Sequence, residues 1–258
     1  MSWRSFVAVG DSFTEGMDDP YPVGDAYRGW ADLVATRLAA EFGPDFRYAN
    51  LAVRGRLFPG VVADQVPEAL SMRPDLISFA AGGNDVLRRN VDIPALVERF
   101  FKVIEELRAT GADVILFRFS DAWVTRLPGA RITLPRGLLL NQAVERAADS
   151  LGATLVNLNE DPDFHHPLMW SIDRLHLSAI GHRRVAAHVL NALGVGCDEE
   201  WLLVPPRPEP SPWLAARAAD LRWAGRYLAP WVKRRLTGRS SGDMITAKRP
   251  TLGPIDPV

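Results

Sequence analysis

Short apolar runs alternate with longer segments of helical periodicity along the first 193 residues. Five runs are almost continuously apolar, as expected of strands with both faces covered: residues 5–9, 46–53, 76–81, 114–119 and 154–158. Apolar spacings of three and four predict helices between and after these runs: residues 27–42, 61–72, 93–110, 138–151 and 178–193. Residues 121–135 follow neither pattern and are predicted to be irregular. The alternation predicts a doubly wound α/β fold around a central five-stranded parallel sheet.

The pattern changes after Leu203. Residues 204–212 are rich in proline, which predicts a stiff and extended linker. Residues 213–236 have the spacing of an amphipathic helix, divided by Pro230. From about residue 238 the chain is rich in glycine, serine and charge, which predicts disorder. We therefore divide the chain into a folded domain, residues 1–203, and a helical C-terminal tail, residues 204–258.

Charge divides the chain at the same place. The formal net charge is −1, but residues 1–200 hold 20 Lys and Arg against 27 Asp and Glu, and residues 201–258 hold 10 against 4. One short basic cluster at 233–235 does not form a nucleic-acid surface, so we expect no nucleic-acid partner. Three interpretations of the 213–236 helix stay open: packing on the acidic domain, acting as a lid, or lying on an anionic membrane surface.

The sequence does not predict a signal peptide, a membrane span or a functional cysteine. The single cysteine, Cys197, cannot form an internal disulfide and stands beside acidic residues. The N-terminal apolar stretch is short and ends at Asp11, unlike a signal peptide. No run approaches the about 18 apolar residues of a membrane span. The expected compartment is the cytoplasm.

Polar residues suited to chemistry follow three predicted strands and precede the last helix. The segments are Gly10-Asp11-Ser12-Phe13, Asn50 to Gly55, Gly82-Gly83-Asn84-Asp85 and Asp173-Arg174-Leu175-His176. In doubly wound folds, ligands bind at the carboxyl ends of the strands. We therefore expect these segments to meet at one edge of the sheet.

These residue types suit acyl transfer. A serine hydroxyl such as that of Ser12 needs a neighbouring base to become nucleophilic, and His176 can serve near neutral pH. Asp173, three residues earlier, can orient the imidazole. The oxyanion-hole candidates are the N–H groups of Ser12 and Gly55 and the amide of Asn84.

Each residue alone has a structural alternative. Ser12 and Asp173 could cap helices, His176 could be a surface histidine, and Asn84 and Gly55 could be turn residues. Their occurrence together, each beside an expected strand or helix end, favours catalysis.

With these motifs in this order, the chain resembles the SGNH hydrolases, also called the GDSL esterase/lipase family. Phe13 stands where leucine is more common in the opening motif. The resemblance spans residues 5–193 and implies a flavodoxin-like, three-layer α/β/α fold. It also implies hydrolysis of esters or thioesters without metal or cofactor. In that family pattern Ser12 is the nucleophile, His176 the base and Asp173 its partner, and Ser12, Gly55 and Asn84 form the oxyanion hole.

The predicted function is a serine esterase that cleaves small-molecule esters of small or medium acyl groups through an acyl-enzyme on Ser12. Two alternatives stay open: a lysophospholipase or thioesterase, and a non-catalytic binding protein on the same fold. An α/β-hydrolase is disfavoured because Thr14 replaces the second glycine of Gly-x-Ser-x-Gly. The acyl length, the alcohol and the oligomeric state stay open.

Overall fold

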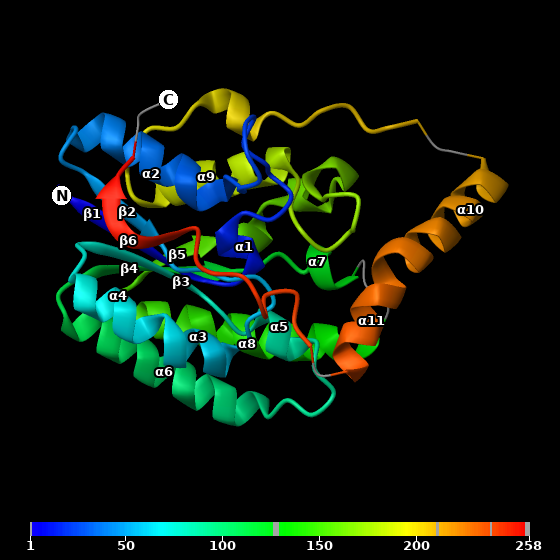
Figure 1. Ribbon diagram of the computed structural model, residues 1–258, viewed down its shortest axis with the longest axis horizontal. Helices are drawn as coiled ribbons and strands as arrows, with labels where there is room; N and C mark the ends of the chain where they lie inside the picture. Colours follow the sequence, from blue (N-terminus) through cyan, green and yellow to red (C-terminus); the bar gives the residue numbers. More distant parts are fainter. Residues whose placement is uncertain (1, 126–128, 210–211, 238, 256–258) are drawn as a thin grey trace.

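A six-stranded sheet forms the centre of the protein (Figure 1). The computed structural model describes residues 2–125, 129–209, 212–237 and 239–255. The strands are β1 (Ser5–Gly10), β2 (Arg47–Asn50), β3 (Leu76–Ala80), β4 (Asp113–Arg118), β5 (Thr154–Asn157) and β6 (Arg249–Pro254). Their order is β5-β4-β3-β1-β2-β6, and β1 to β5 are parallel. The five predicted parallel strands are confirmed, in the flavodoxin-like order 2-1-3-4-5.

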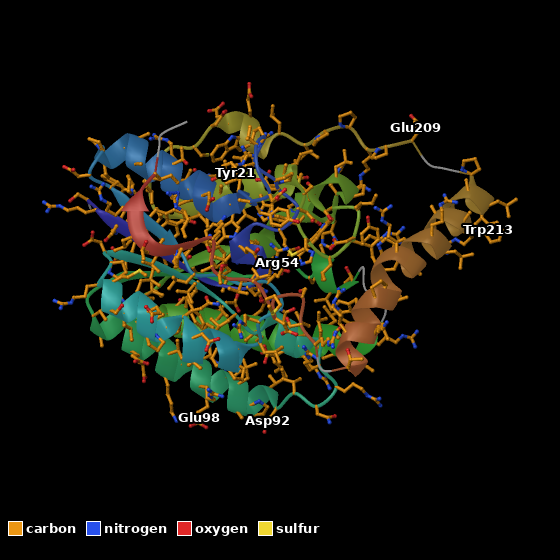
Figure 2. All side chains as sticks on the ribbon, in the orientation of Figure 1. Tyr21, Arg54, Asp92, Glu98, Glu209 and Trp213 are labelled. Carbon is orange, nitrogen blue, oxygen red and sulfur yellow. The ribbon has the colours of Figure 1, made fainter. Side chains whose placement is uncertain are left out.

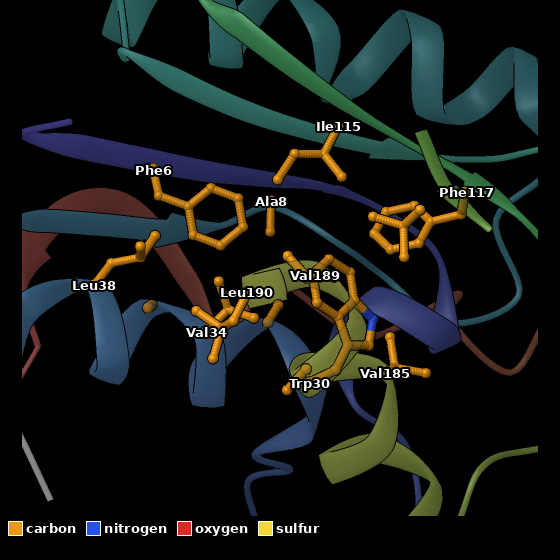
Figure 3. Close-up of a cluster of buried hydrophobic side chains, with 14 of the residues drawn as sticks. Phe6, Ala8, Trp30, Val34, Leu38, Ile115, Phe117, Val185, Val189 and Leu190 are labelled. Carbon is orange, nitrogen blue, oxygen red and sulfur yellow. The ribbon is translucent and has the colours of Figure 1, made fainter. Parts of the chain in front are cut away.

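Two helices, α2 (Gly29–Phe42) and α9 (Ala179–Ala192), cover one face of the sheet (Figure 1). Their apolar side chains, Trp30 and Val189 among them, pack against alternate strand residues such as Phe6 (Figure 3). The Ser178 hydroxyl accepts a hydrogen bond from the Gly181 N–H, so this serine caps α9.

Four helices cover the other face: α3 (Phe58–Asp64), α4 (Val66–Met72), α6 (Ile93–Ala109) and α8 (Ala130–Leu151). The intervening strand residues, Val7 and Val9 on β1 for example, point to this side. The molecule is therefore a three-layer α/β/α sandwich with two cores, one on each face of the sheet.

Short elements occupy the edge where the parallel strands end. They are α1 (Ser12–Glu15), α5 (Gly83–Val86), α7 (Ala122–Thr125) and the 3-10 turns η1 (Leu158–Glu160), η2 (Pro162–His165) and η3 (Pro167–Met169). A further turn, η4 (Glu199–Leu202), follows α9. The chain reverses repeatedly at this edge, so polar groups from distant segments come close together there.

The helix predicted over 61–72 is instead two helices that meet at Gln65. The Gln65 backbone keeps its helical bonds, since its N–H donates to the Val61 carbonyl and its carbonyl accepts from the Ala69 N–H, both at 2.9 Å. Pro67, the second residue of α4, has no N–H to continue this pattern. The Gln65 side chain bonds both backbone groups of Gly10, with Gly10 N to Oε1 and Nε2 to Gly10 O each 2.9 Å, which attaches the junction to β1.

The segment predicted to be irregular, 121–135, contains α7 and the start of α8. Pro135 lies inside α8, where the sequence suggests a break. The guanidinium of Arg136 donates to the carbonyls of Arg88 at 2.7 Å and Arg89 at 3.3 Å. This tertiary contact holds the proline-containing turn in place.

The tail contains α10 (Trp213–Trp223), a π-helical turn η5 (Ala224–Leu228), α11 (Ala229–Leu236) and the strand β6. The helix runs across the end of the sheet, and exposed Trp213 lies at its far end (Figures 1 and 2). The predicted disorder after residue 238 is wrong for the described part, because β6 pairs antiparallel with β2. The sheet is thus mixed, with a sixth strand that the sequence pattern did not reveal.

A buried lysine attaches this strand to the core. Lys248 Nζ lies 2.8 Å from Asp32 Oδ1 and donates to the carbonyls of Tyr27 and Arg28. Asp32 also accepts from the hydroxyls of Tyr21 at 2.7 Å and Tyr48 at 2.8 Å. Every polar atom of this cluster has a partner, which burial of two charges requires. Within the described residues, no helix is both long and apolar enough to cross a membrane.

Replacing Lys248 with alanine should destabilise the protein by about 3 kcal/mol, because Asp32 would keep its buried charge without a counter-ion. Urea unfolding measures the change. The matched control is Lys102→Ala, whose lysine is 67% exposed in a surface pair and should leave the free energy of unfolding nearly unchanged. Equal midpoints for Lys248→Ala and wild type would contradict the integration of the tail into the core.

Candidate active site

A largely apolar cavity lies at the carboxyl ends of the parallel strands. Its polar lining residues come from separate places in the chain: Asp11 and Ser12 after β1, Asn84 on α5, Ser120 after β4, His176 before α9 and His182 on α9. Its apolar lining residues are Phe13, Ala80, Ala81, Leu87, Phe119, Leu158, Phe164, Trp170, Leu175, Leu177 and Val185. The structure therefore brings Ser12, Asn84 and His176 together, as predicted from the order of the motifs.

Ser12 is the first residue of α1, and Asp11 rather than Ser12 caps this helix. The Asp11 Oδ1 atom accepts from the Phe13 N–H at 3.1 Å. The Ser12 N–H has no intrahelical acceptor at this position. The Ser12 hydroxyl therefore does not cap this helix, which was the structural alternative to a catalytic role.

Asn84 links the ends of two strands. Its Nδ2 donates to Asp11 Oδ2 at 3.0 Å and to the carbonyl of Arg56 at 3.1 Å. An amide nitrogen has two hydrogens, so a substrate oxygen at this place must share or replace one of these bonds. Asn84 lines the cavity, and the Asp11 carboxylate holds its amide there.

Gly55 is not among the residues that line the cavity. It has a left-handed φ of 72°, in the turn that presents the Arg56 carbonyl to Asn84. Arg54 fixes this turn from the other side, since its N–H donates to Glu15 Oε2 at 2.7 Å and its guanidinium pairs with the same carboxylate. The turn is therefore anchored to both α1 and α5.

Asp173 and His176 form a tight pair, with Oδ2 and Nδ1 2.5 Å apart and each side chain 16% exposed. Asp173 Oδ1 also accepts from the N–H groups of Leu175 and His176, both at 2.9 Å. Arg174 between them has a left-handed φ of 63°, which turns both side chains to the same side. The predicted pair is confirmed as a contact, and its Nδ1 bond leaves Nε2 for the cavity.

Electrostatics prepares the imidazole to accept a proton. Burial opposes the charged form of His176, but the hydrogen bond and charge of Asp173 outweigh it and raise the pKa of His176 from its ordinary value. Burial opposes ionisation of Asp173 too, yet its bond to His176 holds the pKa of Asp173 below its ordinary value. Burial raises the pKa of Asp11 to about 6.

Asp18 is a site neighbour that the sequence did not single out. A carboxylate oxygen of Asp18, a carboxylate oxygen of Asp173 and a ring nitrogen of His176 all lie within 4.8 Å of one another. The Ser171 hydroxyl lies against both carboxylates, in a short contact with Asp18 Oδ2 and 3.0 Å from Asp173 Oδ1. These donors could hold a cation, but protein hydrogen bonds already join them. No local signal marks Asp18, because the contact spans 153 residues.

His182 on α9 is a second histidine in the cavity wall that sequence reasoning left without a role. Its Nδ1 lies 3.3 Å from the Trp30 N–H, and its Nε2 lies 3.0 Å from the Met17 carbonyl. Burial lowers the pKa of His182 to about 4. It is therefore neutral near pH 7 and already engaged through both ring nitrogens.

The sequence and the fold were compared with known proteins. A profile of the GDSL-like Lipase/Acylhydrolase family matches residues 8–184. The chain is similar to Esterase TesA of Pseudomonas aeruginosa, with 33% identity over 115 residues that cover 44% of this chain and 53% of that protein. The matched part is thus about half the length of this curated relative.

Solved structures share the fold. A structure of TesA superposes with a TM-score of 0.59 at 24% identity, over 73% of this chain and 97% of that one. A catalytic mutant of Axe2, an acetylxylan esterase from Geobacillus stearothermophilus, gives 0.61 at 20% identity, over 78% and 97%. The psychrotrophic esterase EstA from Pseudoalteromonas sp. gives 0.58 at 15% identity, over 77% and 98%. At these identities the likeness concerns the α/β/α fold.

Replacing Asp173 with asparagine should lower the pKa of His176, because the variant removes the negative charge that favours imidazolium while burial persists. NMR titration of ¹³C-labelled histidine rings measures the shift. The control variant is Asp149→Asn, which alters an exposed carboxylate on α8 and should leave the His176 midpoint unchanged. A His176 midpoint that is the same in both proteins would show that Asp173 does not govern the base.

Proposed function

Since this chain belongs to the GDSL-like lipase/acylhydrolase family, we propose that it is a serine esterase that hydrolyses carboxylic esters through an acyl-enzyme on Ser12. The observation that carries the proposal is the 2.5 Å Asp173–His176 pair, which supplies a base to the cavity that Ser12 also lines. Nucleophile, base and orienting carboxylate are the three groups that such a reaction needs.

The proposed reaction has two halves. In the first, His176 Nε2 takes the hydroxyl proton of Ser12 as Oγ attacks the ester carbonyl, and imidazolium then protonates the leaving alcohol. In the second, water loses a proton to Nε2 and attacks the acyl-enzyme, which releases the acid and restores Ser12. Asp173 keeps its charge throughout and stabilises the imidazolium form.

The negative charge that develops on the carbonyl oxygen requires donors. The N–H of Ser12 and the Nδ2 of Asn84 come from the ends of β1 and β3, and both residues line the cavity. The N–H of Gly55, in the turn behind Asn84, is the third proposed donor. Donors that the fold holds in place before reaction lower the barrier without reorganisation.

The apolar part of the cavity supports an acyl group larger than acetyl. Aromatic and aliphatic side chains from several segments line it, among them Phe119, Phe164 and Trp170, and none of them carries a charge. A buried methylene contributes about 0.8 kcal/mol, so such a wall favours longer acyl chains until the cavity is filled.

The names of related proteins support the proposed ester hydrolysis. TesA and EstA are described as esterases and Axe2 as an acetylxylan esterase, and one EstA structure is described as inhibited by monoethylphosphonate. A phosphonate is therefore a suitable probe for a reactive serine in this chain.

Replacing Ser12 with alanine should lower kcat for p-nitrophenyl butyrate by about 10⁴-fold or more, because no other group can form the acyl-enzyme. The same substitution should abolish phosphonate labelling, measured by mass spectrometry of peptides. The control is Ser120→Ala, since Ser120 lines the same cavity but its hydroxyl accepts from the Ala122 N–H. Labelling of any residue other than Ser12 in wild type would refute the proposed nucleophile.

A panel of p-nitrophenyl esters should show kcat/KM rising about fourfold per methylene from acetate to hexanoate, in line with burial of each methylene. An acyl thioester and a lysophospholipid belong in the same panel, because faster cleavage of either would favour that alternative activity. A decline from acetate onward would contradict the proposed acyl cavity. A folded protein that cleaves none of these compounds would favour a binding role instead.

A further inference from the structure

The C-terminal tail contacts two loops that the proposed function uses. Between the body and β6, the chain passes the Asp173–His176 loop and then the Gly55 turn. These contacts lie at the end of the sheet that α10 and α11 cross (Figure 1).

The first contact is made by α10. Asp220 Oδ1 accepts from Arg174 Nη2 at 2.9 Å, and the Arg174 guanidinium lies 4.7 Å from the centre of the Trp223 ring. Arg174 is the residue whose left-handed φ turns Asp173 and His176 to the same side. A left-handed conformation is unfavourable for a residue with a Cβ, so it persists where surrounding contacts hold it.

The second contact is made by residues 240–242. The Ser240 hydroxyl donates to the Gly55 carbonyl at 3.2 Å. Gly242 is buried against Arg54, and a Cβ on Gly242 would collide with the Arg54 carbonyl. A Cβ on Gly55 would likewise collide with the Ser240 hydroxyl. The close approach of the two turns therefore requires a glycine at 242, where the neighbouring atom is a backbone carbonyl.

The segment that makes these contacts is held at its far end. Asp243 Oδ2 accepts from the Ser240 N–H at 2.9 Å, which shapes the 240–243 turn. A few residues later, Lys248 and β6 enter the core. Removing the whole tail would thus remove a strand and leave Asp32 unpaired, so point substitutions in the full chain are the appropriate probe.

We propose that residues 213–245 act as a clamp, in which Asp220 and Trp223 position the Asp173–His176 loop through Arg174 while Ser240 and Gly242 position the Gly55 turn. This inference rests on the proposed esterase function and adds positioning residues to it. Among the described residues, the clamp reaches the proposed catalytic groups through Arg174 and the Gly55 turn, so its loss should impair catalysis rather than substrate binding.

The test uses Asp220→Ala and Ser240→Ala, singly and together, in the full chain. Each single variant should lower kcat for p-nitrophenyl butyrate about tenfold, with KM and melting temperature unchanged, because small displacements of catalytic groups slow the chemical step. The double variant should lose more, and the rate of phosphonate labelling at Ser12 should fall in parallel. Asp220→Glu, which keeps the carboxylate, should restore most of kcat.

Two controls come from the same segment. Arg222→Ala and Met244→Ala alter exposed neighbours, and Met244 is 94% exposed. Both should leave kcat within twofold of wild type.

A double variant that also stays within twofold would overturn the clamp while the esterase function stands. A fall in melting temperature that accompanies the loss of kcat and is not reversed by Asp220→Glu would assign the tail a structural role only. A wild type that neither hydrolyses the ester nor reacts with phosphonate would overturn the function itself, and with it the clamp.

Discussion

Coverage of both faces of the parallel sheet is the constraint on which the rest of this structure depends. Strand side chains such as Phe6 and Val7 point alternately into two apolar cores, so few polar side chains lie within the strands. Polar chemistry is possible only where the strands end. Because β1 to β5 run in one direction, their carboxyl ends meet at one edge, and α1, α5 and the loop before α9 converge there.

Buried polar contacts then determine the positions within that edge. Gln65 holds both backbone groups of Gly10, and Asp11 joins the cap of α1 to the amide of Asn84. Glu15 anchors the turn at Arg54. A buried group without a partner is costly, so each of these contacts restricts its segment to one arrangement. The apolar layers therefore place the site, and a few buried hydrogen bonds define its geometry.

The division of charge between body and tail has a structural counterpart. The tail is basic, and its Lys248 is paired with Asp32 of the body, yet the contact of α10 with the site has the opposite polarity, with Asp220 in the tail and Arg174 in the body. Net charge thus describes the two segments correctly but does not tell which face of the tail meets the body. Of the three interpretations of the 213–236 helix, these contacts favour packing on the body, at the edge where the site lies.

The sequence by itself determined the order of the strands and helices in the chain and the residue types at the sheet edge. Continuous apolar runs identified β1 to β5. The motif residues Ser12, Asn84 and His176 were predicted to meet at one edge of the sheet, because ligands bind at the carboxyl ends of parallel strands. Local patterns carry this information, since burial on both faces leaves a direct mark on composition.

Only the tertiary structure decided the contacts between segments distant in the chain. The strand β6 lacks a long apolar run because it lies at the sheet edge and is held largely by backbone pairing and by Lys248. Asp18 meets Ser171, beside the Asp173–His176 pair, across 153 residues, and Ser240 meets Gly55 across 185. Such contacts leave no periodic trace in the sequence, because they depend on where the fold places two short turns and not on the composition of either.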